Sequence, residues 1–245
     1  MSESESSFAM AVSHMRKCVL TVYNLSQAQG WFIILCMILD KMWRDPYNTL
    51  WNAKEILATE IMIYQALQAM QWLDVVFPLI GFTRTVVINA FLQTTARSIF
   101  GFISLPMHYE SVPLTLPVLI CFALGEWSRY SYNLLQILNL VQTRIGRVVA
   151  HLRWNLFLVL YPIGAFGDGL AGVLTIGVLK AAEPMPYSVS MPNKGNFAFN
   201  MAYFFTVLPF MYMAQFPINF GHLLRKRREF YAQALLNEVK NNKMD

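Results

Sequence analysis

Charged residues are scarce in this sequence. They make up 13% of the 245 residues, about half of the ~25% that is typical of soluble domains. Hydrophobic residues make up 56% of the chain. So little charge cannot cover the surface of a soluble domain, and the composition therefore excludes a soluble protein and indicates an integral membrane protein.

Cysteine and histidine are also few and scattered. The three cysteines form no paired spacing, and the four histidines form no cluster. The sequence contains neither a Cys-x5-Arg phosphatase loop nor a glycine-rich nucleotide fingerprint. These absences exclude a disulfide scaffold, a histidine-dependent membrane desaturase or hydroxylase, a cysteine phosphatase and a reductase with a bound dinucleotide. We therefore expect no metal and no cofactor.

Long apolar segments dominate the rest of the chain. Each is close to the ~20 residues that cross ~30 Å of hydrocarbon as a helix. They run over residues 18–39, 56–77, 85–105, 112–138, 154–179 and 197–224. The pattern predicts an all-α, polytopic integral membrane protein with six transmembrane helices in one bundle. The membrane domain covers residues 16–228, between an N-terminal tail (1–15) and a C-terminal tail (229–245).

The basic residues predict the orientation of these helices. Of the nineteen Lys and Arg residues, twelve fall on one side of the predicted membrane and five on the other. Lys and Arg concentrate in cytoplasmic loops, so both termini are expected in the cytosol. Topology thus accounts for the net charge of +5 without a nucleic-acid partner.

Several charged residues lie inside the apolar segments, where each costs ~2.5–3.5 kcal/mol on insertion scales. They are Glu60, Arg97, Glu126, Arg129 and Asp168. For any one of them, an ion pair between helices and a functional role are equally reasonable. For the set, a polar site inside the bundle is the better interpretation. A transport path is the rival, but it predicts an inverted repeat, which the sequence lacks.

Helical spacing places these polar residues on shared faces. Glu126 and Arg129 are three residues apart, and Gln93 and Arg97 are four apart, so the members of each pair share a face. Tyr161 and Asp168 are seven apart and project the same way, ~10 Å apart along the axis.

Small and kinking residues lie between Tyr161 and Asp168. Pro162 can bend the helix. Gly164 allows close approach by a ligand or, in the interpretation we favour, by a neighbouring helix.

The same residues carry a resemblance to a known family. Leu160-Tyr161-Pro162-Ile163-Gly164 resembles the segment Leu-Tyr-Pro-x-Gly-x-x-x-Glu of the 3-hydroxyacyl-CoA dehydratases of the endoplasmic reticulum, the protein tyrosine phosphatase-like proteins. Matches elsewhere in the chain are Gln93 with Arg97, and Glu126 with Arg129-Tyr130. The resemblance implies a lyase that removes water from (3R)-3-hydroxyacyl-CoA to give trans-2-enoyl-CoA during very-long-chain fatty acid elongation.

The resemblance also implies partners and a location. The substrate is an acyl-CoA, and the protein lies in the lipid of the endoplasmic reticulum membrane. Other elongation-cycle enzymes, namely the condensing enzyme and the reductases, are its expected protein partners.

By resemblance, the catalytic pair is Tyr161 and Asp168, although the family has glutamate where this chain has Asp168. Dehydration needs a base for the proton α to the thioester and an acid for the leaving hydroxyl. We assign Tyr161 as base and Asp168 as acid, and the reverse assignment stays open. Tyrosine ionises near pH ~10 in water and needs a cation to act as a base, for which Arg129 is the candidate. The expected supporting residues are Glu126, Tyr130, Arg97, Gln93 and Gly164.

Two further expectations concern the cytosolic end and the aspartate. Arg144, Arg147 and Arg153 can meet the phosphates of CoA, although membrane topology alone also explains them. The shorter side chain of Asp168 keeps a second function open, namely a catalytically impaired homologue that acts as a membrane scaffold for elongation enzymes.

Overall fold

The computed structural model describes residues 3–51, 57–108 and 115–241, and within these ranges almost all regular structure is helical. A single β-bridge joins Val189 and Phe199 in the described part of the chain. The elements are α1 (Glu3–Arg44), α2 (Pro46–Trp51), α4 (Ala58–Met70), α5 (Leu73–Leu79), α6 (Val87–Ile99), the π-helical turn η1 (Phe100–Ser104), α7 (Leu105–His108), α8 (Thr115–Ile137), α9 (Arg144–Ala181) and α10 (Met201–Asn241).

Most of each predicted apolar segment is helical where it is described, although residues 85–86 and 197–200 precede their helices and several helices are longer than expected. Helix α1 begins at Glu3, inside the expected N-terminal tail, and α10 continues through the expected C-terminal tail to Asn241. The second segment is divided into α4 and α5 by a turn at Gln71 and Trp72. Residues 56 and 112–114 of the predicted segments lie outside the described ranges.

Three of the described helices are long and apolar enough to cross a membrane. They lie at Met10–Arg44, Arg144–Ala181 and Met201–Leu236. Large apolar side chains also point outward, as Phe166 on α9 and Met213 on α10 show with exposed fractions of 73% and 74%. Such a surface suits lipid rather than water. The class predicted from composition is thus supported, whereas the number of six crossings stays a prediction.

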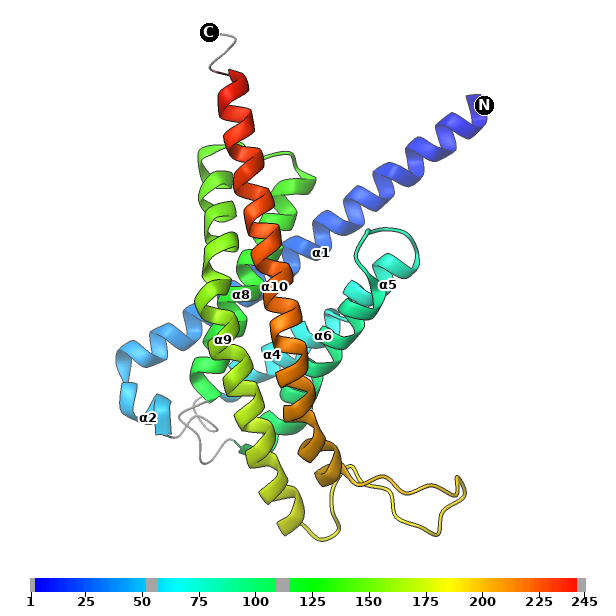
Figure 1. The fold of residues 1–245 in the computed structure, drawn as a ribbon, viewed down its shortest axis with the longest axis vertical. Coiled ribbons are helices and arrows are strands. Elements are labelled where there is room, and N and C mark those ends of the chain that lie inside the picture. Colours follow the sequence, from blue (N-terminus) through cyan, green and yellow to red (C-terminus); the bar gives the residue numbers. More distant parts are fainter. Residues whose placement is uncertain (1–2, 52–56, 109–114, 242–245) are drawn as a thin grey trace.

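The chain runs back and forth between two ends of the bundle. Figure 1 shows the start of α1, the α5–α6 and α8–α9 connections and the end of α10 toward one end, with the α9–α10 loop at the other. The segments with the most Lys and Arg therefore lie toward the same end. Which end faces the cytosol stays a prediction based on charge.

The core lies where α1, α4 and α8 meet. Trp31 and Tyr64 are almost fully buried there, with ring centroids 5.4 Å apart. Gly30 permits this close approach, because a Cβ at that position would lie 2.5 Å from Leu67 Cδ2. Buried Glu60 pairs with Lys41, with Nζ and Oε1 2.6 Å apart. For Glu60, therefore, an ion pair between helices is the explanation that the structure supports.

Candidate active site

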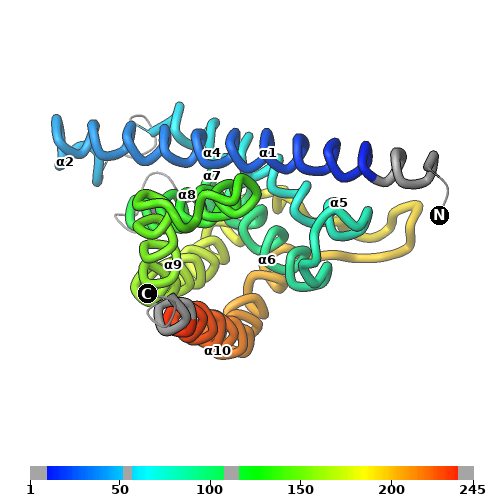
Figure 2. Tube along the Cα trace, turned by 90° about the horizontal axis from the view of Figure 1, so that it is seen from above, coloured from blue at the N-terminus to red at the C-terminus, as the bar shows by residue number. Residues whose placement is uncertain are grey.

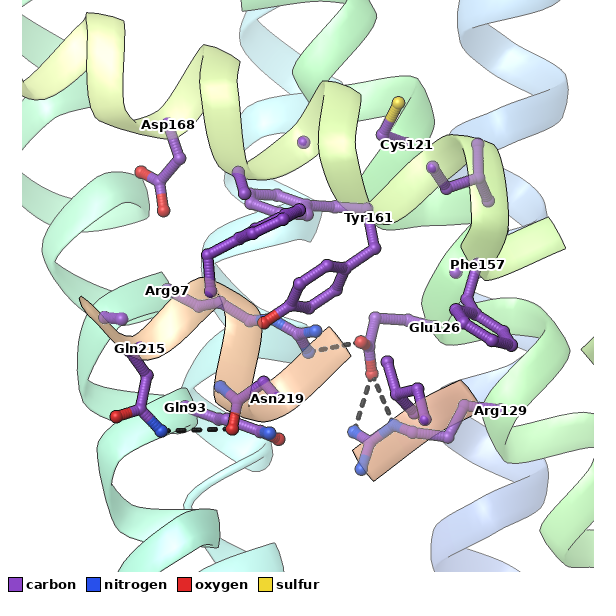
Figure 3. Close-up of a pocket in the computed structure, with 18 of the residues that line it drawn as sticks. Gln93, Arg97, Cys121, Glu126, Arg129, Phe157, Tyr161, Asp168, Gln215 and Asn219 are labelled. Carbon is purple, nitrogen blue, oxygen red and sulfur yellow. Dashed lines mark hydrogen bonds and ion pairs between the residues drawn. The ribbon is translucent and has the colours of Figure 1, made fainter. Parts of the chain in front are cut away.

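A cavity of about 220 Å³ lies between α6, α8, α9 and α10 (Figure 3). Tyr161 and Asp168 both line it, as do Gly164 between them and Gln93 and Arg97 from α6. Helix α8 contributes Glu126 and Arg129, and α10 contributes Tyr212, Gln215, Phe216 and Asn219. The spacing on α9 explains the first pair, because residues seven apart on a helix face the same way.

Gly164 lies between α8 and the cavity. A Cβ there would lie 3.7 Å from Cys121 Cβ and from Phe122 Cε1 of α8. This is ordinary van der Waals contact, so a methyl group would fit there and the packing of α8 against α9 does not require glycine. Since the residue also lines the cavity, its missing side chain leaves space between Tyr161 and Asp168.

The ring of Tyr161 is held by aromatic residues of α10. Its centroid lies 5.3 Å from that of Phe216 and 6.0 Å from that of Phe220, and the rings are tilted or stacked. Figure 3 shows the phenol oxygen directed toward Arg97 and Asn219. Arg97, and not the expected Arg129, is thus the arginine that lies near this phenol.

Asp168 is buried, with an exposed fraction of 7%. Its Oδ2 accepts a hydrogen bond from the hydroxyl group of Tyr212 on α10. Among the described residues, no cation forms an ion pair with it. The carboxyl group therefore has a neutral donor on one oxygen, and the other oxygen carries no bond within the described protein.

Sequence analysis did not find the residues of α10. Tyr212, Phe216, Asn219 and Leu223 all line the cavity, and they recur every three or four positions. This spacing is the signal that was available, since it marks one helical face with polar members inside an apolar segment. The sequence does not, however, indicate which helix this face of α10 packs against.

Glu126 is the most heavily bonded carboxylate of the site. Arg97 Nη1 donates to its Oε1, and Arg129 Nε donates to its Oε2 at 2.8 Å. Gln71 Nε2 from the turn between α4 and α5 also donates to Oε2, at 2.9 Å. These hydrogen bonds fix the carboxylate and hold the side chains of Arg97 and Arg129 against it.

Tyr130 does not line the cavity and lies in a polar cluster behind it. Its hydroxyl donates to Asp74 Oδ2 at 2.8 Å, and Tyr23 donates to Asp74 Oδ1 at 2.9 Å. Arg129 joins this cluster through an ion pair with Asp74 at 2.9 Å. Tyr130 and part of Arg129 thus tie α8 to α1 and α5, away from Tyr161.

The structure separates the three arginines in the first part of α9. Arg153 lines the cavity, and its guanidinium carbon lies 5.6 Å from the ring centroid of Trp154. It forms no ion pair with any described carboxylate. Arg144 and Arg147 instead line a shallow hollow on the outer surface, with Val148, His151 and Leu152. No group of three or more potential metal ligands occurs among the described residues.

Together, the fold and the cavity define a helical membrane protein that encloses a phenol, a carboxyl group and a guanidinium in one interior space. Residues 68–233 match the model of a family described as protein tyrosine phosphatase-like protein, PTPLA. The match covers more than half of the chain, and the protein belongs to this family. The resemblance read from the sequence is thereby confirmed.

Curated relatives of the chain carry enzyme names. Very-long-chain (3R)-3-hydroxyacyl-CoA dehydratase 1 of Mus musculus is 29% identical over 216 residues, which cover 86% of this chain and 72% of the relative. Dehydratase 2 of Homo sapiens is 25% identical over 213 residues, covering 86% and 79%. The dehydratase PASTICCINO 2B of Oryza sativa subsp. japonica is 25% identical over 226 residues, covering 91% and 96%. No solved structure is significantly similar to the chain.

Proposed function

We propose that the protein removes water from a (3R)-3-hydroxyacyl-CoA to give a trans-2-enoyl-CoA in very-long-chain fatty acid elongation. One observation carries the proposal: in a member of this family, Tyr161 and Asp168 line the same cavity. Dehydration requires a base and an acid on either side of a two-carbon unit, and the pair provides both types of group.

In the proposed reaction, Tyr161 is the base and Asp168 the acid. The Tyr161 phenolate takes a proton from Cα, and the electron pair of that C–H bond forms the Cα=Cβ double bond. The bond between C3 and its hydroxyl oxygen breaks, and Asp168 gives its proton to the leaving group, which departs as water. Arg97 is the cation near the phenol, and its positive charge is proposed to stabilise the phenolate. The reverse assignment of acid and base would use the same two groups.

Tyr212 prepares Asp168 for this role. Because its hydroxyl donates to Oδ2, the proton of a neutral Asp168 is held on Oδ1, where it can be given to substrate. Replacing Tyr212 with phenylalanine is expected to lower kcat about tenfold, the size of one lost hydrogen bond to a charged or polar catalytic group. The measurement is steady-state kinetics on purified protein. An unchanged kcat would show that Tyr212 does not orient the acid.

The CoA end of the substrate is expected toward the arginine-rich end of the bundle. Arg153 is the arginine of α9 that reaches the cavity and lacks a carboxylate partner, so it can bind a phosphate or the thioester end. Arg144 and Arg147 remain candidates for phosphates farther out. The protein is proposed to lie in the endoplasmic reticulum membrane with both termini in the cytosol, beside the condensing enzyme and reductases.

Binding of CoA can be tested at Arg153. Arg153→Met keeps an unbranched apolar stem and removes the guanidinium group with its charge. It is expected to raise KM about tenfold, since one charge-assisted bond is worth ~1.5–3 kcal/mol. Arg225→Met, on the exposed surface of α10, is the matched control and is expected to leave KM unchanged. Equal KM values for the two variants would rule out a contact between Arg153 and CoA. Membrane topology would then be the better explanation of the positive charge at Arg153.

The activity itself is tested with purified protein in lipid nanodiscs, (3R)-3-hydroxyacyl-CoA and detection of trans-2-enoyl-CoA by mass spectrometry. Turnover that saturates with substrate supports the proposal.

The second candidate function, a membrane scaffold with impaired catalysis, is favoured by Asp168 in place of the glutamate expected from the resemblance. It predicts no turnover by the wild-type protein together with stable binding to other elongation enzymes.

A further inference from the structure

The cavity is small for the substrate that the proposed function requires. Its volume is about 220 Å³, below the ~300–1,000 Å³ of pockets that enclose a drug-sized ligand. A very-long-chain acyl-CoA is larger than such a ligand, because it has a nucleotide at one end and a long acyl chain at the other. The cavity can therefore hold the reacting carbons, while the rest of the acyl chain must leave through an opening in the wall.

One side of the wall is not closed by helix packing. Figure 2 shows α8, α9 and α10 as a curved wall, with α6 standing beside its open side. Helix α9 packs closely against both α8 and α10. Within the described ranges, α6 packs against α4, α5 and η1 and makes at most sparse contact with α8 and with α10. The ion pair between Arg97 and Glu126 joins α6 to α8, whereas no ion pair joins the described residues of α6 to α10. Because α6 and α10 both line the cavity, the seam between them is where it can open.

Side chains at this seam line the cavity and are also exposed at the surface of the protein. Leu92 on α6 lines the cavity and is 41% exposed. Gln93 is likewise exposed and lines the cavity. On α10, Gln215 Nε2 donates to Asn219 Oδ1 at 3.0 Å, and Figure 3 shows both residues on the same side of the cavity as Gln93. Residues that line the cavity and are also exposed are the candidates for the mouth of the cavity.

The rim outside this mouth is apolar. Phe220 stacks on Tyr161 and so marks the side of α10 that faces α9. Met211 and Ile218 lie about half a turn from Phe220, by the ~100° that each residue adds around a helix. They are 53% and 65% exposed. Beyond the ring of amide side chains, a chain that leaves the cavity thus meets apolar side chains and then lipid.

We propose that the acyl chain of the substrate leaves the cavity sideways through the seam between α6 and α10 and lies in the hydrocarbon of the bilayer. The inference rests on the proposed function, since it concerns the same site. Lipid tails are as apolar as a protein interior, so a chain in the bilayer needs no protein groove to bury it. The length of the chain beyond the mouth therefore does not limit binding.

Photolabelling tests the path of the chain. Two analogues of a long-chain 3-hydroxyacyl-CoA carry a diazirine, one close to the thioester and one at the chain end, and are bound to the protein in nanodiscs. The first is expected to label cavity residues such as Leu160, and the second is expected to label lipid together with Met211 or Ile218. If the second analogue labels the buried core around Trp31, the proposed path through the seam is wrong, but the proposed function is not affected. If the first analogue fails to label the cavity, both fall.

A pair of variants on α6 provides an independent measurement. Leu92→Trp fills the mouth, whereas Ile88→Trp adds the same bulk one turn away on an exposed surface outside the cavity. Leu92→Trp is expected to lower kcat/KM for a long-chain substrate about tenfold more than for a four-carbon substrate. Ile88→Trp should change neither. An equal loss for both chain lengths in Leu92→Trp would contradict the proposal.

Discussion

Tyr161→Phe is expected to lower kcat for dehydration by about 10²–10⁴-fold, the contribution that general acid–base catalysis typically makes. The substitution removes only the hydroxyl, and the ring keeps its packing against Phe216 and Phe220. The fold and KM should therefore change little. The measurement is kcat from enoyl-CoA formation in nanodiscs, with thermal unfolding recorded in parallel.

The matched control for this substitution is Tyr203→Phe. Tyr203 is on α10, is 70% exposed and does not line the cavity. Its loss of a hydroxyl should leave kcat at the wild-type value. Undiminished turnover in Tyr161→Phe would remove Tyr161 from the mechanism and with it the acid–base pair.

Asp168→Asn is expected to cause a loss of similar size, about 10²–10⁴-fold in kcat. Asparagine has nearly the same shape and can still accept the hydrogen bond from Tyr212, but it cannot give a proton to the leaving hydroxyl. Asp40→Asn is the control, because Asp40 pairs with Arg44 on the exposed end of α1, outside the cavity. The readout is again kcat, with binding of the substrate measured separately.

Asp168→Glu separates the two candidate functions. A displacement of ~1 Å at a reacting group can change a rate by ~100-fold, so the added methylene tests whether the aspartate is well placed. Activity in both proteins, with a rise in Asp168→Glu, would support the catalytic site. No turnover by either protein would favour the scaffold.

The sequence could predict relations within one helix, because helical geometry alone determines them. Tyr161 and Asp168 share a cavity, and so do Gln93 and Arg97, since each pair is spaced close to whole turns. Composition likewise predicted a helical membrane protein. These predictions needed no knowledge of how the helices pack.

Relations between helices could not be predicted in the same way. Arg129 was the expected cation for Tyr161. Both arginines pair with Glu126, but Arg129 is also bound to Asp74 behind the cavity, whereas Arg97 lies near the phenol. Tyr130 was expected at the site and lies behind it. In both cases a side chain had several suitable partners on other helices. The rotation of one helix relative to another decides which of these partners it contacts.

The sequence by itself determined the apolar helices, the faces on which polar residues gather and the family, because periodicity, hydropathy and motif are local properties of the chain. Only the tertiary structure decided that α10 supplies Tyr212 to Asp168, that Arg153 but neither Arg144 nor Arg147 reaches the cavity, and that α6 and α10 leave a seam. The physical reason is that ridge-into-groove packing sets the rotation and spacing of whole helices, and many side chains determine that packing together.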